Sequence, residues 1–240
     1  MLICMVSPVF LCVRIVIHMI KGILFDFDCT LSSRYEAAYW MYRDMMHQIL
    51  PDMDPESIAF EAMVQDVLYW DQYGTVDKRY VLERFEEKYA PGMDIEKWRD
   101  YWYAHFHEFQ IPAPHAREIL EELQKKYRLG VVTNGNGVSQ LAKLKVLDME
   151  KYFPVRIASG DLGISKPDPR IFQIAAEQLG LPCSEIAFIG DNFQADIYGA
   201  VQAGMTPVWL CRERKTVSTW PVRKIAEFEE IRQIFLEETE

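Results

Sequence analysis

The sequence predicts an α/β protein in which a parallel sheet forms the core and a helical domain is inserted into it. Short apolar runs recur along the chain, and each leads into a polar or glycine-containing loop and then a helical pattern. This alternation is typical of parallel sheets, whose strands are joined through helices. The long span between the first two apolar runs lacks a strand pattern. With 240 residues, half of them hydrophobic, the chain can form one such core and a modest insertion.

The elements of the core follow from these patterns. Strands are expected at 20–27, 129–133, 155–159, 186–189 and 207–211, and helices at 114–127, 137–147, 169–179, 193–203 and 225–237. The helix at 169–179 has a clear start signal, because Asp168 can cap its first turn and Pro169 tolerates the first helical position.

The insertion is expected at residues 33–111. Tyr, Trp, Met and charged residues recur there at helical spacing, as in Val81, Phe85 and Tyr89. A connection of this length is too long for a loop in a compact domain, so we expect a small helical domain of its own. The core then comprises residues 19–32 and 112–240.

Residues 1–18 are expected to lie outside the fold. They are almost wholly apolar, but Arg14 interrupts them. A signal peptide would begin with basic residues and end at a small-residue cleavage site, and neither is visible. A membrane-spanning helix needs about twenty apolar residues, and a central arginine would cost about 3 kcal/mol. We therefore favour an upstream extension before a natural start at Met19 over a membrane anchor.

Charge and cysteine content narrow the class of protein. The formal net charge of −10 and the absence of a run of five Lys or Arg argue against nucleic-acid binding. The five cysteines are scattered, with no C-x-x-C pair, which argues against a disulfide framework or a structural zinc site. We expect a protein of a reducing compartment, the cytoplasm. The sequence gives no indication of the oligomeric state.

Two carboxylates follow the first apolar run. Asp26 and Asp28 are two residues apart at the end of a strand, so both can address the same space. Two neighbouring carboxylates repel each other, which separates their pKa values or demands a cation. One can then act as a nucleophile while the other transfers a proton.

Three further loops carry polar residues at the ends of the expected strands, where the sites of open parallel sheets lie. Thr133 and Asn134 precede a glycine-rich segment suited to an oxyanion. Lys166 lies in a proline-stiffened turn that suits a fixed positive charge. Asp191, Asn192 and Asp196 offer oxygen ligands for a hard cation such as Mg²⁺, which takes one or two carboxylates and leaves room for phosphate and water.

Together these loops resemble the haloacid dehalogenase-like superfamily. Its D-x-D-x-T motif falls on Asp26, Asp28 and Thr30, its threonine motif on Thr133, its lysine motif on Lys166, and its acidic motif on Asp191 and Asp196. The motifs stand in the order of the family, and the resemblance covers Met19 to the last strand. It implies a Rossmann-like core with a helical cap of the C1 type. Cys29 departs from the pattern, since the family usually has glycine there.

The resemblance implies a role for each residue. Asp26 would attack phosphorus, and Asp28 would protonate the leaving group and then activate water. Mg²⁺ would be bound by Asp26, the Asp28 carbonyl and Asp191, with Asn192 or Asp196 in support. Thr133, Asn134 and Lys166 would bind the transferred phosphoryl group. Because the dehalogenases of the family lack the second aspartate, Asp28 favours the phosphatase branch.

The expected activity is Mg²⁺-dependent hydrolysis of a small phosphomonoester, such as a sugar phosphate, phosphoglycolate or a nucleoside 5′-monophosphate. A cap that closes over the site would exclude water and limit substrates to small molecules. Arg34 and Tyr35, where the cap begins, are candidates for contacts to the leaving group. Two alternatives remain open: a phosphosugar mutase of the same superfamily, and a non-catalytic phosphate-binding or interaction module. The physiological substrate is not indicated.

Overall fold

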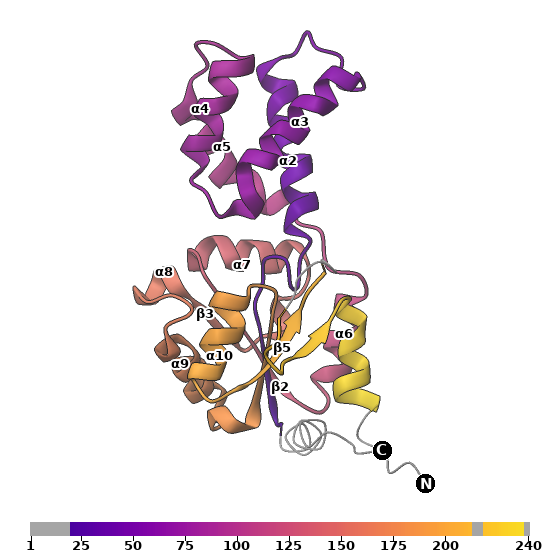
Figure 1. The fold of residues 1–240 in the computed structure, drawn as a ribbon, viewed down its shortest axis with the longest axis vertical. Helices are drawn as coiled ribbons and strands as arrows, with labels where there is room; N and C mark the ends of the chain where they lie inside the picture. Colours follow the sequence, from indigo (N-terminus) through magenta and orange to yellow (C-terminus); the bar gives the residue numbers. More distant parts are fainter. Residues whose placement is uncertain (1–19, 213–217, 238–240) are drawn as a thin grey trace. The chain divides into compact units, whose positions relative to one another are not determined.

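The computed structural model describes residues 20–212 and 218–237 (Figure 1). The expected N-terminal extension, residues 1–18, lies outside the described residues. The chain divides into two compact units. One, the core unit, comprises the chain up to Ser32 and from Pro112 onward, and the other, the helical unit, is Ser33–Ile111.

The core unit contains a six-stranded parallel sheet in the order β3-β2-β1-β4-β5-β6. Its strands are β1 (Gly22–Phe25), β2 (Arg128–Thr133), β3 (Val155–Ala158), β4 (Ile186–Gly190), β5 (Thr206–Leu210) and β6 (Arg223–Ile225). The first strand lies in the middle, and the chain extends the sheet outward on either side of it. This is the Rossmann-like order, so the predicted α/β fold class is confirmed.

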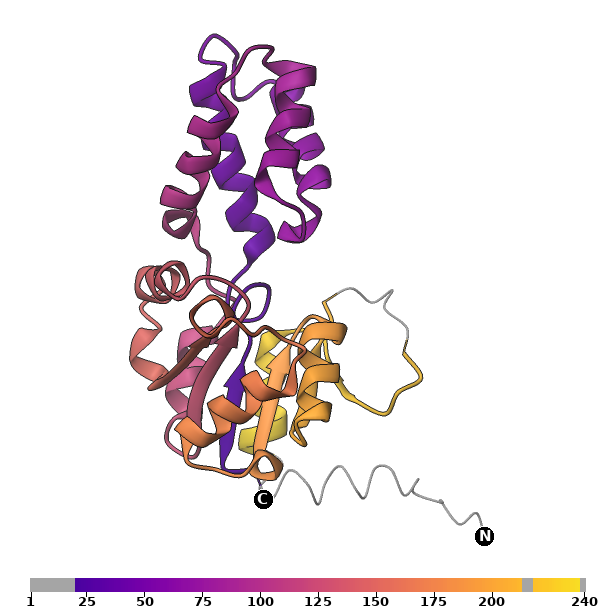
Figure 2. The same ribbon diagram turned by 90° about the vertical axis from the view of Figure 1, so that its left-hand side faces the viewer.

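Helices cover both faces of this sheet (Figures 1 and 2). They are α6 (Ala116–Leu123), α7 (Gly137–Val146), α8 (Ser159–Leu162), α9 (Pro169–Leu179) and α10 (Gly199–Gln202), with 3₁₀ or π turns at η3 (Glu150–Tyr152), η4 (Cys183–Glu185), η5 (Phe193–Tyr198), η6 (Phe228–Glu230) and η7 (Gln233–Glu237). Alternate residues of β1 face opposite ways: Phe25 packs with α6 and the C-terminal turns, whereas Leu24 packs with α9. The sheet is therefore apolar on both faces, as parallel sheets are.

The helical unit consists of α2 (Arg34–Ile49), α3 (Ile58–Asp71), α4 (Lys78–Tyr89) and α5 (Ile95–His105), with short turns at η1 (Gln72–Gly74) and η2 (Phe106–Phe109). All of residues 33–111 are described, and they contain no strand. Aromatic and Met side chains form the interior, including Tyr42, Phe60, Phe85 and Trp102. The unit thus has a hydrophobic core of its own.

The C-terminal segment differs from the prediction. A helix was expected from Ile225, but Arg223–Ile225 forms strand β6 beside β5. Ile225 is 3% exposed, and its carbonyl accepts a hydrogen bond from Cys211 N at 2.7 Å. Helical turns begin only at Phe228, after a capping box made by Glu227 and Glu230. So short a strand, with two basic residues in it, gives no alternating apolar signal.

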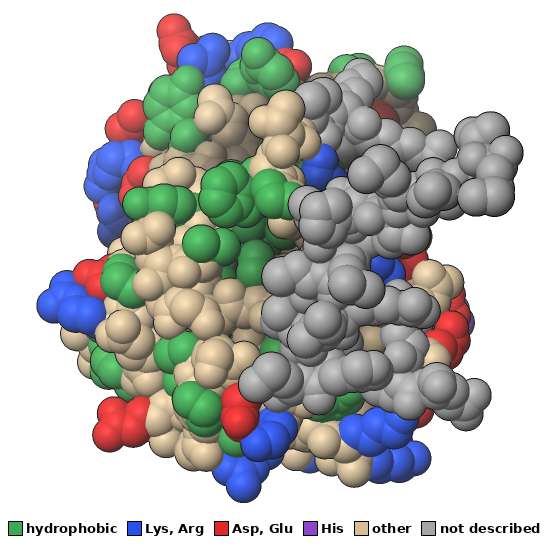
Figure 3. Space-filling model, turned by 60° about the horizontal axis from the view of Figure 1, so that its bottom comes forward, with side chains coloured by type: hydrophobic (Ala, Val, Ile, Leu, Met, Phe, Trp, Pro, Cys, Tyr) green, Lys and Arg blue, Asp and Glu red, His purple; other side chains and the backbone are tan. Residues whose placement is uncertain are grey.

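On the face shown in Figure 3, Lys and Arg side chains are interspersed with Asp and Glu and do not form one basic patch. Among the described residues, no helix is both long enough and apolar enough to cross a membrane.

Candidate active site

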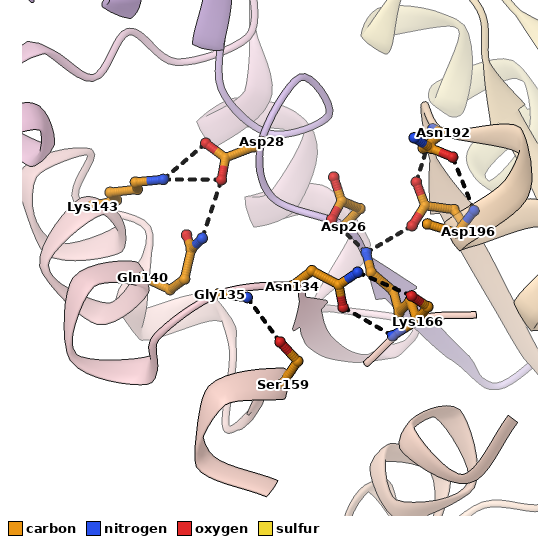
Figure 4. A network of polar contacts seen from close by, with 11 residues as sticks. Asp26, Asp28, Asn134, Gly135, Gln140, Lys143, Ser159, Lys166, Asn192 and Asp196 are labelled. Atoms are coloured by element: carbon orange, nitrogen blue, oxygen red, sulfur yellow. Dashed lines mark hydrogen bonds and ion pairs between the residues drawn. The ribbon is translucent and has the colours of Figure 1, made fainter. Parts of the chain in front are cut away.

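The polar residues predicted from the sequence meet at one edge of the sheet. Asp26 follows β1, Thr133 ends β2, and Asp191 follows β4. These three strands are neighbours, and Phe25 is in register with Val131 on one side and Ile189 on the other. Because parallel strands end on the same side, residues more than a hundred positions apart share one space (Figure 4).

Lys166 is the central cation of this group. Its Nζ donates to Asp26 Oδ1 at 2.5 Å and to Asp196 Oδ1 at 2.7 Å, and it lies 5.5 Å from the ring centroid of Phe188. The residue is 5% exposed, which lysine rarely is unless it is paired. Lys166 therefore joins the first and last acidic motifs into one ion-paired group.

The pKa values of Lys166 and Asp26 reflect the negative charge that surrounds them. Burial alone would lower the pKa of Lys166, but the carboxylates of Asp196 and Asp26 outweigh it and raise that pKa. Burial, together with Asp196 and Asp191, raises the pKa of Asp26 well above its ordinary value, against the opposing effect of Lys166. One lysine thus does not balance the negative charge gathered here.

Asp26, Asp191 and Asp196 each offer an oxygen within 4.8 Å of the others. Burial and the charge of Asp196 raise the pKa of Asp191 to about 7, although Lys166 and Arg212 act in the opposite direction. The carbonyl of Asp191 accepts a hydrogen bond from Trp209 Nε1 at 2.8 Å, which fixes its backbone. An excess of oxygen ligands and negative charge in a small space is what a hard divalent cation requires.

Asp196 differs from the other two carboxylates because both of its oxygens are engaged. Oδ1 accepts from Lys166, and Oδ2 accepts from Asn192 N at 2.9 Å. The residue is 1% exposed and lies in the π turn η5, a kind of turn common at functional sites. Asn192 is exposed and caps this turn through its side chain at Ala195 N. Asp196 therefore holds Lys166 and the Asp191–Asn192 loop in place.

Asn134 also supports Lys166. Its Nδ2 donates to the Lys166 carbonyl at 3.1 Å, and its Oδ1 accepts from Lys166 N at 2.9 Å. Both ends of the side-chain amide are thus occupied by main chain. The expectation that Asn134 binds phosphoryl oxygens stays a prediction, and the geometry adds a positioning role for its side chain.

The loop after β2 is tied to the next βα connection. Gly135 N donates to Ser159 Oγ at 3.0 Å, and Gly160 N donates to the Gly135 carbonyl at 2.8 Å. Asn136 then caps α7 by accepting from Val138 N and Ser139 N. Thr133, 3% exposed, ends β2 just before this loop. The region predicted to bind an oxyanion is therefore a braced turn that leads into a helix N-terminus.

Asp28 faces a different neighbour from Asp26. Its two carboxylate oxygens each lie 2.9 Å from Lys143 Nζ, and Oδ2 also accepts from Gln140 Nε2 at 3.1 Å (Figure 4). Sequence reasoning missed both α7 residues, because each reads as an ordinary helix side chain. A signal was present: Gln140, Lys143 and Leu144 share one face of a helix that follows a site loop.

Cys29 occupies a backbone position that suits glycine. The residue has φ of +65°, in the left-handed region that side chains with a Cβ disfavour by about 1–2 kcal/mol. It begins the tight turn in which Leu31 N donates to the Phe27 carbonyl at 2.9 Å. Cysteine at this position thus carries a conformational cost, and the turn itself is formed.

Arg34 and Tyr35 belong to the helical unit. Arg34 is 9% exposed, and its guanidinium donates to Asp71 at 2.9 Å. Tyr35 is half-exposed and lies against Tyr73, with ring centroids 5.8 Å apart. Their predicted contacts with the leaving group stay predictions.

The chain is similar in sequence to a known family of hydrolases and to several phosphatases. The profile of the family described as haloacid dehalogenase-like hydrolase matches residues 23–210. The chain is similar to glyceraldehyde 3-phosphate phosphatase of Pyrococcus abyssi, with 31% identity over 80% of this chain and 82% of that protein. It is also similar to the pyrimidine 5′-nucleotidase YjjG of Escherichia coli, with 28% identity over 87% and 96% of the two chains.

Among solved structures, the fold is similar to that of a HAD phosphatase from Thermococcus onnurineus. The TM-score is 0.62 at 26% identity, and the match covers 90% of this chain and 98% of the other. The likeness thus extends over nearly the whole length of both proteins.

Proposed function

Because the chain belongs to the haloacid dehalogenase-like hydrolases, we propose that it is a Mg²⁺-dependent phosphatase that forms an aspartyl-phosphate on Asp26. The family and the hydrolase class predicted from the four motifs are confirmed by this membership and by phosphatase relatives. The observation that carries the mechanism is the buried group in which Lys166 joins Asp26 to Asp196 beside Asp191.

The residues at this group fit a magnesium ion. Three carboxylates lie around Lys166, and burial together with their mutual repulsion raises the pKa values of Asp26 and Asp191. Since Asp196 already uses both oxygens, Asp26 and Asp191 are the carboxylates that would hold the ion directly, with the Asp28 carbonyl as a further ligand. When bound, Mg²⁺ supplies positive charge to offset that of the phosphate and the carboxylates.

In the first step, a carboxylate oxygen of Asp26 attacks phosphorus and forms the P–O bond of the aspartyl-phosphate. The bond to the leaving oxygen breaks, and that oxygen takes a proton from Asp28. Lys166, fixed 2.5 Å from Asp26, neutralises negative charge on the phosphoryl oxygens. Thr133 and the turn before α7 contribute hydrogen-bond donors at the same edge of the sheet.

In the second step, water attacks the phosphorus of the intermediate. Asp28, now a carboxylate, takes the proton of that water, and the bond to Asp26 breaks. Inorganic phosphate leaves, and Asp26 is again a carboxylate. One residue thus gives a proton in the first step and receives it back in the second. A halide leaving group needs no such proton, so Asp28 supports phosphomonoester hydrolysis over dehalogenation.

The proposed substrates are small phosphorylated metabolites. The relatives bear the names of phosphatases for glyceraldehyde 3-phosphate and pyrimidine nucleotides, which are compounds of this class. We assign the helical unit the role of the cap that selects the leaving group, with Arg34 and Tyr35 as candidate contacts. Its separate hydrophobic core is consistent with a body that moves as a unit.

A panel of phosphomonoesters tests the proposal. The purified chain with Mg²⁺ should release inorganic phosphate from at least one of them, and EDTA should abolish the release. Asp26→Asn should also abolish it, since an amide cannot act as the nucleophile. Asp52→Asn, the same change at an exposed position of the helical unit, is the matched control and should be as active as the wild type. Phosphate release that survives Asp26→Asn would contradict the mechanism, and isomerised product without phosphate would indicate a mutase.

A further inference from the structure

Two residues of α7 stand out beside the proposed proton-transfer group. Lys143 is 5% exposed and Gln140 is 7% exposed, although each has a polar end that favours water. Both are turned toward Asp28, whereas Asp26 is turned toward Lys166 (Figure 4). The two carboxylates of the first motif are therefore held by different cations, and only one of these cations belongs to a motif found from the sequence.

The contacts fix the carboxylate of Asp28 in position and in orientation. Lys143 Nζ lies 2.9 Å from both oxygens, and Gln140 Nε2 lies 3.1 Å from Oδ2. A lone contact would leave the carboxylate free to rotate, but three contacts define its plane. Lys143 Nζ also lies 5.6 Å from the ring centroid of Phe27, which is fully buried. The ammonium is thus enclosed between the carboxylate and the core of the unit.

Lys143 and Asp28 differ in how far their side chains are exposed to solvent. The side chain of Lys143 is 6% exposed, whereas that of Asp28 is 24% exposed. The lysine is nearly buried, whereas the Asp28 side chain is partly open to solvent, as contact with a substrate requires. An ion pair with a purely structural role does not require one partner to be exposed. Such a pair is also not required for stability, because replacing a buried ion pair by apolar residues is often neutral or stabilising.

The helix that carries these residues also begins at the oxyanion turn. Asn136 caps α7, and Gln140 and Lys143 follow one and two turns later. The turn at Asn134–Asn136 and the carboxylate of Asp28 are therefore held by a single helix. A change in the side chains of α7 would move the carboxylate relative to that turn, and proton transfer is sensitive to such small displacements.

We propose that Lys143, assisted by Gln140, is the positioning residue that holds Asp28 for proton transfer to the leaving group. This inference rests on the proposed function, in which Asp28 gives a proton to the leaving group and, as the carboxylate that Lys143 pairs with, takes one from water. It assigns Lys143 no contact with the substrate. The loss of Lys143 should therefore resemble a partial loss of Asp28, and it should matter most where the leaving group needs a proton.

The experiment compares two substrates that differ in this need. Glycerol 3-phosphate must gain a proton at its leaving oxygen, whereas p-nitrophenyl phosphate releases a stable phenolate without one. Lys143→Met keeps the length and apolar stem of the side chain but removes the charge. We expect it to lower kcat/KM for glycerol 3-phosphate by at least about tenfold and for p-nitrophenyl phosphate by less than about threefold. Lys145→Met, the same change at an exposed position of the same helix, should leave both values unchanged.

A double-mutant cycle tests whether Lys143 acts through Asp28. Asp28→Asn should show the same preference for p-nitrophenyl phosphate, and adding Lys143→Met to it should change kcat/KM by less than about twofold. Circular dichroism establishes that each variant is folded. If Lys143→Met fails to fold, Gln140→Ala removes only the 3.1 Å contact and should shift the substrate ratio in the same direction.

The outcomes distinguish this inference from the proposed function. Equal losses for both substrates, an unchanged or raised activity, or a full additional loss in the Asp28→Asn background would each overturn the positioning role. A wild-type chain that hydrolyses neither these two substrates nor any in the panel would overturn the proposed function itself, and the inference would fall with it.

Discussion

Lys166 shows how much a single residue contributes to the candidate site. It is the cation between Asp26 and Asp196, and Asn134 holds its main chain from both sides. Removing one partner of a buried ion pair leaves the other charges uncompensated in a medium of low polarity. The position is therefore sensitive in stability and in activity at once.

We predict that Lys166→Met destabilises the Mg²⁺-free protein by about 3–5 kcal/mol, the range for a broken buried pair. Phosphate release should fall by at least about a hundredfold, because the charge next to the phosphoryl group is lost. Urea unfolding in EDTA and the phosphatase assay measure the two effects. Lys125→Met, an exposed lysine of the core unit, is the control. A stability equal to that of the wild type would mean that the ion-paired group is not formed in solution.

Asp191 provides a test of the metal site that does not depend on activity. Mg²⁺ at a hundred times its Kd should stabilise the core unit by about 2.7 kcal/mol, because an ion that binds only the folded state shifts the unfolding equilibrium. Its melting temperature should rise by roughly 5–10 °C for a chain of this size. Asp191→Asn should remove most of this rise, whereas Asp52→Asn should retain it. An equal rise in both variants, measured by differential scanning fluorimetry, would place the ion elsewhere.

At the scale of elements, three helices of the helical unit, α2, α3 and α4, are joined by a buried polar cluster at the end of α3. Asp71, 1% exposed, accepts hydrogen bonds from Arg34 of α2 at 2.9 Å and from Tyr42 of α2 at 2.7 Å, and it is also paired with Lys78 of α4. Burial would raise the pKa of Asp71, but the charges of Arg34 and Lys78 and the hydrogen bonds outweigh it and lower that pKa.

The direction of this shift predicts the pH dependence of stability. Because the pKa of Asp71 is lower in the folded than in the unfolded state, its stabilising contribution is present above the ordinary value of 3.8. It is lost as the pH falls below that value and through the folded-state pKa. Asp71→Asn should therefore destabilise the helical unit by about 3–5 kcal/mol at pH 7 and by less at pH 3. Urea unfolding at the two pH values measures this difference.

Asp100→Asn is the matched control for this cluster. Asp100 lies on α5 of the same unit with a side chain that is 76% exposed. The substitution should change the free energy of unfolding by less than about 0.5 kcal/mol at either pH. If Asp71→Asn behaved like this control, the cluster would not hold the helices together.

Strands and helices with a long apolar pattern could be predicted from the sequence, whereas short ones could not. The strand at 186–189 was predicted to within a residue, because a buried parallel strand is a continuous apolar run. Strand β6 was missed, because Arg223 and Lys224 interrupt its pattern and its pairing with β5 is a tertiary contact. Asp26 could be found because its motif is local in the sequence, whereas Lys143 could not, because its role depends on a tertiary contact. Lys143 is 115 positions from Asp28, and its burial depends on how α7 packs.

At the scale of the whole molecule, the chain consists of two units that each bury their own apolar residues. Each of the hydrophobic clusters lies wholly within one unit. The chain passes between the units where it leaves the core at Ser32 and where it returns at Pro112, and these residues form a bridge within the core unit. Next to it, Ala113 N donates to the Leu31 carbonyl at 2.9 Å. The ends of the insertion are therefore already side by side.

This arrangement predicts that the core unit folds without the helical unit. Replacing residues 33–111 by a short Gly-Ser linker spans a gap that the bridge between Ser32 and Pro112 already closes, and it leaves every residue of the two core clusters in place. The shortened protein should melt cooperatively. It should still hydrolyse p-nitrophenyl phosphate with Mg²⁺, because Asp26, Asp28 and Lys166 all lie in the core unit.

Selectivity is what the shortened protein should lose. If the helical unit chooses the leaving group, the spread of kcat/KM between the best and the worst substrate of the panel should shrink by about tenfold or more. The shortened protein with Asp26→Asn is the control for contaminating phosphatase and should be inactive. A shortened protein that unfolds would show that the core unit depends on the insertion for stability. One that folds and ranks substrates as the full chain does would place the choice of substrate in the core unit, among the loops at the carboxyl edge of the sheet.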